Sequence, residues 1–300
     1  SKSAALLMVG GTVLNFILDP IMIFGFFGFP RMGIQGAALA TVISQALMMI
    51  AAIYILHKKL HLLSFSSFSF DEILNSWRQI LYIGIPSVLS SVLTPISALI
   101  VVKIVANFGS PAVAAFGVAN RFEMFAFMIP MTVGISLVPF TAQNYGAERF
   151  DRIESARKGA MIFAIIYGVI IAGIFFFTVH KLAGLFSNDR NVVDVLIQYI
   201  CITCFGYGFL EVHRYSGFFM TGIHKPFFSA LLNAFRVVVL LIPLSFIGAI
   251  IFGLQGVFWA RLLTDIASGS FGVFLSGKIL HLSVEKLPME AEFKASVDLS

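Results

Sequence analysis

Charged residues are scarce in this sequence, and cysteine is almost absent. Charged side chains make up 12% of the 300 residues, against roughly 25% in soluble domains, and 59% of the residues are hydrophobic. So little charge does not cover a surface in water, which argues against a soluble enzyme and favours lipid as the solvent. The two cysteines, Cys201 and Cys204, are too few for a disulfide scaffold. Because both lie in an apolar run, we expect them to pack and not to bind metal.

Motifs that carry chemistry in membrane-embedded enzymes are missing as well. The sequence has no paired aspartates for a magnesium–diphosphate site, no HExxH and no GxSxG. No loop resembles a channel filter. The net charge of +5 is modest and the basic residues lie between apolar runs, so no nucleic acid partner is expected. These absences predict a protein that is not an enzyme and carries no cofactor.

What the sequence does contain is a series of eight long apolar runs. A bilayer core about 30 Å thick needs roughly 20 apolar residues of helix, and prolines within such helices are tolerated. The runs cover residues 4–27, 33–56, 79–106, 111–142, 158–180, 192–221, 226–250 and 254–280. They predict an all-α, polytopic membrane protein built as a helical bundle.

The basic residues between the runs predict how the chain is oriented. Cytoplasmic loops carry an excess of lysine and arginine. Taken alternately, the loops of one side hold Lys58, Lys59, Arg78, Arg149, Arg152, Arg157, Lys158, Lys225 and Lys278. The loops of the other side hold Arg31, Lys181 and Arg190. We therefore expect both ends of the chain to be cytoplasmic.

A short motif occurs twice. Residues 33–36 (GIQG) open the second run and residues 253–256 (GLQG) open the eighth, and the run before each contains a proline, Pro20 or Pro243. The order of these features predicts that the first two runs are repeated as the seventh and eighth. One repeat then comprises six helices, and the two copies are parallel. On this reading the first lobe is incomplete, and four of its helices would precede the chain.

The repeat divides the chain into four parts. Residues 1–57 would be the last two helices of an N-terminal lobe, and residues 78–282 a six-helix C-terminal lobe. Residues 58–77, rich in serine and phenylalanine, are expected to form an interfacial cytoplasmic linker. Residues 283–300 are expected to form a polar, disordered cytoplasmic tail.

Three stretches resemble the multidrug and toxic compound extrusion (MATE) family. They are NFILDPIMIFG…GIQGAALATVISQ, IGIPSVLSSVLTPI and FGVANRFEMFAFMIPMTVGISLVPFTAQNYGAER. The resemblance covers residues 4–282 and corresponds to the fifth through twelfth helices of a twelve-helix transporter. It implies a two-lobed protein that exports cationic or amphipathic compounds in exchange for H⁺ or Na⁺.

The resemblance also implies a cation-coupling site in the N-terminal lobe. The family's asparagine and aspartate on the fifth helix match Asn15 and Asp19, and a threonine on the sixth helix matches Thr41. If the coupling ion is Na⁺, Asp19 and Asn15 would be its ligands. A glutamate that some members carry on the seventh helix corresponds here to Thr94, which argues against a second sodium site of that kind.

The residues themselves support a functional aspartate. Asp19 is the only charge in the first run, and a carboxylate deep in a bilayer costs roughly 2.5–3.5 kcal/mol. Asn15 lies one helical turn before it, on the same face. Carboxylate, amide and hydroxyl oxygens suit a hard cation, and a buried carboxyl can also exchange a proton. The alternative is that Asp19 is neutral or caps a packed polar cluster.

Other charges inside the runs have no obvious local partner. Arg121 and Glu123 are two residues apart and point different ways on a helix, so each needs a partner elsewhere, with Glu211 or Arg214 as candidates. We take Glu123, Arg121 and Glu211 as candidates for lining a cavity in the C-terminal lobe.

Two further spacings predict self-contained ion pairs with a structural role. Glu211 and Arg214 are three residues apart, and Arg261 and Asp265 are four apart. Arg236 lies near enough to the end of its run to be expected to extend toward the membrane surface.

The leading functional hypothesis is a monomeric secondary active antiporter in the plasma membrane, in contact with the lipid bilayer and with small organic cations or amphipathic compounds. A lipid-precursor flippase of the same superfamily is the alternative and would favour a more basic cavity. A membrane-embedded enzyme is the less favoured third reading.

Overall fold

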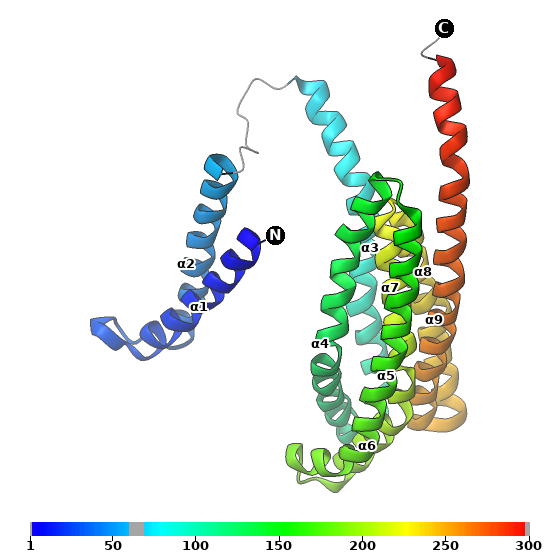
Figure 1. The fold of residues 1–300 in the computed structure, drawn as a ribbon. Coiled ribbons are helices and arrows are strands. Elements are labelled where there is room, and N and C mark those ends of the chain that lie inside the picture. The colour runs from blue at the N-terminus through cyan, green and yellow to red at the C-terminus, as the bar shows by residue number, and fades with distance from the viewer. Residues whose placement is uncertain (1, 60–68, 298–300) are drawn as a thin grey trace. The chain divides into compact units, whose positions relative to one another are not determined.

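The computed structural model describes residues 2–59 and 69–297, and it divides into two compact units between Ile73 and Leu74. Every regular element within these residues is a helix (Figure 1). Seven helical stretches are long and apolar enough to cross a membrane. Their outer surfaces expose large apolar side chains such as Val169 and Phe177, as lipid contact requires. The chain is an all-α, polytopic membrane protein.

The first unit is a helical hairpin. Its elements are α1 (Lys2–Phe24), η1 (Phe26–Gly28), α2 (Gly33–Tyr54) and the π-helical turn η2 (Ile55–Lys59). Gly36 on α2 lies directly against the backbone carbonyl of Met22 on α1, where any side chain at residue 36 would clash. The two helices therefore touch through their backbones at the closed end of the hairpin.

The second unit is a bundle arranged around α7 (Figure 1). Its elements are α3 (Phe70–Ala106), α4 (Ser110–Gly146), α5 (Phe150–Phe186), α6 (Arg190–Thr203), η3 (Cys204–Gly206), α7 (Tyr207–Gly222), α8 (Pro226–Ala234), η4 (Phe235–Leu241) and α9 (Ile242–Val297). Helix α7 contacts α4, α5, α8 and α9. Its side chains Tyr215 and Met220 are fully buried. Cys204, in η3, packs against Phe127 and Tyr207, which is the packing role expected for it.

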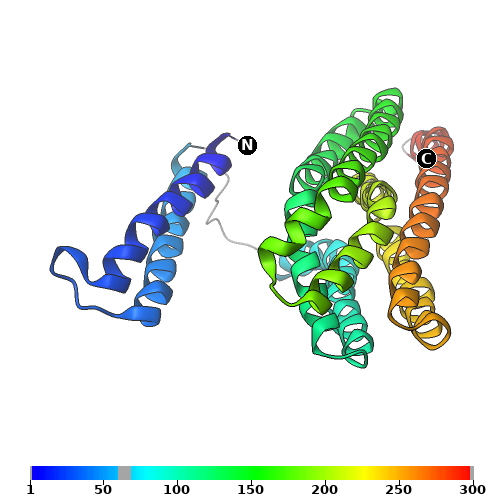
Figure 2. The same ribbon diagram turned by 90° about the horizontal axis from the view of Figure 1, so that it is seen from below.

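The last membrane-spanning stretch contains two predicted runs. It extends from Pro226 to Leu282, and its 57 residues are more than one crossing requires. The helix breaks at Gly253, whose φ of 62° and ψ of −144° are not helical. Gly248 and Gly256 lie in backbone contact across this break, so the two parts of α9 fold back on each other (Figure 2). The seven stretches thus contain the eight runs.

The two copies of the short motif have the same local geometry. Gly33 and Gly253 both have a positive φ, of 55° and 62°, which glycine adopts without strain. Gly36 and Gly256 each lie against a backbone carbonyl of the preceding helix, that of Met22 or Gly248. In both places a left-handed glycine turns the chain and a second glycine lets the helices approach. The structure supports the repeat at this local level.

The C-terminal tail differs from the prediction. The tail from residue 283 was expected to be disordered, but α9 continues as a helix to Val297. Glutamate, lysine, leucine, methionine and alanine dominate this stretch, and all are good helix formers. Within the predicted linker, residues 70–77 form the start of α3, whereas residues 60–68 lie outside the described residues.

Candidate functional site

A first polar cluster lies inside the hairpin of the first unit. Asn15 Nδ2 donates to Asp19 Oδ1 at 3.3 Å, and to Thr41 Oγ1 on α2 at 3.4 Å. Both distances are long for hydrogen bonds. Asn15 and Asp19 share one face because they are one helical turn apart, as predicted. The structure thus brings together all three residues of the predicted coupling site.

This first cluster is loosely held. Asn15 and Asp19 are half-buried in the unit, and Thr41 is exposed. In the described part of the chain, Asp19 forms no ion pair. Pro20 follows it within α1 and has no N–H to donate to the preceding turn. Within the described residues, Asp19 is therefore a carboxylate without a countercharge beside it.

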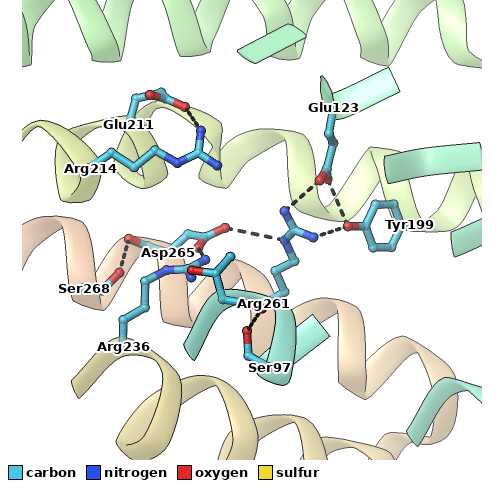
Figure 3. Close-up of polar contacts among 10 residues, drawn as sticks. Ser97, Glu123, Tyr199, Glu211, Arg214, Arg236, Arg261, Asp265 and Ser268 are labelled. Carbon is cyan, nitrogen blue, oxygen red and sulfur yellow. Dashed lines mark hydrogen bonds and ion pairs between the residues drawn. The ribbon is translucent and has the colours of Figure 1, made fainter. Parts of the chain in front are cut away.

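A second polar cluster, in the second unit, is built on Arg261 (Figure 3). Arg261 Nη2 lies 2.8 Å from Glu123 Oε2, and its Nη1 donates to the hydroxyl of Tyr199 at 2.5 Å. That hydroxyl in turn donates to Glu123 Oε1 at 2.9 Å, and the hydroxyl of Tyr207 donates to the same oxygen at 3.2 Å. One carboxylate, one guanidinium and two phenols from α4, α6, α7 and α9 therefore form a closed network.

Asp265 extends this cluster and corrects the predicted self-contained pair. Its Oδ1 lies 2.6 Å from Arg236 Nη2, whereas its Oδ2 is 3.8 Å from Arg261 Nε. The spacing of four residues brings Arg261 and Asp265 near each other, but each has a closer partner on another helix. Arg236 does not extend toward the membrane surface as expected, because Asp265 holds it in the interior.

Glu211 and Arg214 form the remaining ion pair of the cluster. The two side chains meet at 2.5 Å on one face of α7, as their spacing predicts. The guanidinium of Arg214 also lies over the ring of Phe127, 5.0 Å from its centroid. Arg121 is exposed on α4 and lies outside this network.

A cavity of about 420 Å³ opens beside these ion pairs. Its polar wall includes Arg214, Arg236, Arg261, His213, Asn120, Asn233, Ser90, Ser91, Thr94, Ser97, Ser229 and Ser245. Its apolar wall includes Phe116, Phe218, Phe258 and Met131. This volume lies in the range of sites for small organic molecules.

The cavity changes the interpretation of the acidic candidates. Glu123, Arg121 and Glu211 were expected to line it, and none of the three does. Glu123 and Glu211 lie behind the wall, bonded to Arg261 and Arg214, whose side chains do form it. Sequence reasoning identified the carboxylates but not the surface that faces the cavity.

Several lining residues were not predicted from the sequence at all. Arg236 and His213 are polar side chains in apolar helices, and each needs a partner or a purpose there. That signal was present in the sequence, yet the partner of Arg236 is 29 residues away and its identity depends on how the helices are rotated. Tyr199 carried no signal, because a tyrosine in an apolar helix usually only packs.

Known protein families include one that matches this chain. A family model described as MatE matches residues 86–247, slightly more than half of the chain. The chain belongs to the MatE family. This match confirms the resemblance to MATE transporters that the three sequence stretches indicated.

Two curated relatives match more of this MatE-family chain than the family model does. A protein named FAD transporter from Shewanella oneidensis is 31% identical over 279 residues, which are 93% of this chain and 62% of the relative. Multidrug export protein MepA from Staphylococcus aureus (strain MW2) is 30% identical over 263 residues, 86% of this chain and 56% of the relative. The chain thus spans about three fifths of the length of these relatives.

A solved structure shows the same fold. The crystal structure of the Vibrio cholerae MATE transporter VcmN in the bent form matches this MatE-family chain with a TM-score of 0.83 at 27% identity. The match covers 94% of this chain and 63% of the solved one. The relatives are named as transporters and exporters and not as enzymes, in agreement with the absence of enzymatic motifs.

Proposed function

We propose that this chain belongs to a secondary active antiporter that exports amphipathic organic compounds across the plasma membrane in exchange for H⁺ or Na⁺. The names of the relatives, multidrug export protein and FAD transporter, support organic compounds as the class of substrate. The distribution of basic residues supports cytoplasmic ends of the chain. Glu123 and Glu211, the acidic positions that argued against a basic cavity, lie behind the cavity wall.

The observation that carries this proposal is the state of Asp19. It is the only charged side chain in the interior of α1. The amide of Asn15 lies beside it and bonds in turn to the hydroxyl of Thr41, and no countercharge lies beside it among the described residues. A carboxylate in a bilayer is costly, so a cation that binds it gains a favourable interaction. Uptake and release of that cation on opposite sides would couple the ion gradient to export.

The donor set of this first cluster suits either coupling ion. A single carboxylate is sufficient to bind and release H⁺. For Na⁺, the cluster offers oxygens of Asp19, Asn15 and Thr41, fewer than the six or more that hard cations such as Ca²⁺ take. Sodium would therefore need water or oxygens from outside the first unit.

The test is gradient-driven transport by the full-length protein in proteoliposomes. A proton or a sodium gradient is imposed, and export of a fluorescent amphipathic compound is followed for the wild type and for Asp19→Asn. We expect export by Asp19→Asn to fall to the level of empty liposomes, because asparagine keeps the shape but not the charge. Which of the two gradients drives the wild type identifies the coupling ion.

Asp189→Asn is the matched control. Asp189 accepts a hydrogen bond from the backbone of Asn191 at the start of α6, and asparagine is an equally good cap there. This variant should export at the wild-type rate. Full gradient-driven export by Asp19→Asn would show that coupling resides elsewhere.

A further inference from the structure

The cavity of the second unit has a wall of one charge. Its lining contains three arginines, whereas no aspartate or glutamate lines it within the described ranges 2–59 and 69–297. The three carboxylates that balance these arginines are nearly inaccessible: the side chains of Glu123, Glu211 and Asp265 are 6%, 1% and 0% exposed.

In each ion pair the arginine therefore faces the cavity and the carboxylate faces the protein interior. The side chains of Arg261, Arg214 and Arg236 are 17%, 33% and 13% exposed, more than their partners in every case. The cluster is neutral in sum, but its positive ends face the cavity and its negative ends face the protein. Since a group in the cavity is closer to the guanidinium than to the carboxylate, the attraction of an anion outweighs its repulsion.

The arginines also have donors to spare. A guanidinium carries five N–H donors in a planar fork. Among the described residues, the guanidinium of Arg214 forms one hydrogen bond, to Glu211. Nε of Arg236 and Nδ1 of His213 are buried without a partner. Arginine forks match the oxygens of phosphate and carboxylate groups.

The rest of the lining fits an aromatic body. Phe116, Phe218 and Phe258 line the same cavity as the arginines, and Asn120 and Asn233 add amide groups that can bond to polar edges. Asn233 Nδ2 donates to the carbonyl and the hydroxyl of Ser90, at 2.8 and 3.0 Å, and so holds α3 against this side of the cavity.

From this geometry we infer that the second-unit cavity binds the anionic group, a phosphate or a carboxylate, of an aromatic amphipathic substrate through Arg214, Arg236 and Arg261. The inference rests on the proposed transport function and specifies the charge of what is carried. Of the cationic or amphipathic compounds that the family resemblance implied, it favours amphipathic compounds with an anionic group, because the guanidinium groups and not the carboxylates reach the cavity.

The test compares two fluorescent ligands that differ by one phosphate. Binding of flavin mononucleotide and of riboflavin to the purified full-length protein in nanodiscs is measured by fluorescence anisotropy, with ethidium as a cationic third ligand. We expect the wild type to bind flavin mononucleotide at least tenfold more tightly than riboflavin. Equal affinities for the two flavins, or tighter binding of ethidium, would overturn the inference.

Variants of one ion pair sharpen this test. Glu211→Gln should keep or strengthen the preference for the phosphate, because it removes a countercharge and leaves Arg214 in place. The double variant Glu211→Gln with Arg214→Gln should lose at least part of the preference and still fold, since no buried charge is left unpaired. Arg121→Gln, at an exposed arginine of α4 outside the cavity, is the control and should bind as the wild type does. Loss of the preference in Glu211→Gln alone would contradict the inference.

Two further readouts separate the possible sources and failures. A polyprenyl phosphate that displaces flavin mononucleotide would assign the phosphate site to a lipid headgroup, whereas displacement only by soluble aromatic phosphates assigns it to a soluble substrate. Both results support recognition of phosphate. Gradient-driven export without any preference for the phosphate would overturn this inference and leave the proposed function intact. Phosphate preference without gradient-driven export would do the reverse.

Discussion

Asp19 in the first unit and Asp265 in the second are both aspartates inside apolar helices, yet their surroundings are opposite. Asp19 is half-buried, and its one described side-chain bond, from Asn15, is 3.3 Å long. Asp265 is fully buried and lies 2.6 Å from Arg236. Among the described residues the first carboxylate has no counterion, whereas the second lies near two arginines, Arg236 and Arg261, and the latter also pairs with Glu123.

The difference separates two uses of charge in a membrane. A buried carboxylate paired with arginines joins helices, so the ion pair is part of the fold. A carboxylate with only neutral neighbours can bind and release a cation without breaking the fold. The same substitution, aspartate to asparagine, should therefore have different consequences in the two units.

The largest effect is expected for Asp265→Asn. It leaves Arg236 without its closest partner, and breaking a buried pair costs about 3–5 kcal/mol. We expect a large loss of folded yield and of thermal stability in detergent, measured by fluorescence-detected size exclusion over a temperature series.

A double-mutant cycle shows which arginine is the partner of Asp265. The coupling energy of Asp265→Asn with Arg236→Gln should exceed that with Arg261→Gln, because the respective distances are 2.6 and 3.8 Å. A larger coupling with Arg261 would restore the self-contained pair that the sequence suggested.

An intermediate effect is expected for Gly256→Ala. The added methyl would meet the backbone of Gly248, and overpacking of this kind costs about 1–3 kcal/mol. Gly36→Ala should cost a similar amount in the first unit, where the methyl would meet the carbonyl of Met22. Thermal unfolding of both variants tests whether the two motifs are structurally equivalent.

Gly117→Ala is the control for the glycine variants. Gly117 lies within α4 with open space around it, so alanine should be neutral or stabilise by up to about 1 kcal/mol through helix propensity. Equal losses at all three glycines would mean that close helix contact is not the cause.

The smallest effect on stability is expected for Asp19→Asn. Its contacts are long and it forms no ion pair among the described residues, so the substitution breaks no strong contact and removes a costly charge. The unfolding free energy should therefore not fall by more than about 0.5 kcal/mol. Thermal unfolding of the same preparation used for transport measures this. A loss of stability comparable with that of Asp265→Asn would mean that Asp19 has a structural role and would remove the contrast between the units.

Sequence reasoning succeeded where the contact is local. The eight runs follow from hydrophobicity and length, and the pairs Asn15–Asp19 and Glu211–Arg214 follow from helical spacing. Thr41 was assigned by resemblance to known transporters, and the structure places it beside Asn15.

It failed where the contact depends on helix rotation. Glu123 and Arg261 are 138 residues apart, and both lie in helices that are apolar on nearly every side. Such helices have no strong polar face to show which way they point. For the same reason the sequence could not show that arginines and not carboxylates face the cavity.

Arg236 lies in η4, where the helix widens into π-helical turns between α8 and α9. A substitution in this segment changes one contact, but loss of one residue would rotate the helix that follows by about 100° relative to α8. Arg236 and Asp265 lie on opposite sides of the break at Gly253, so a rotation of one part of the helix moves the two side chains out of register. The spacing between Pro226 and Gly253 is therefore a constraint of its own. A deletion here should be tolerated less than replacement of any apolar side chain in the same stretch.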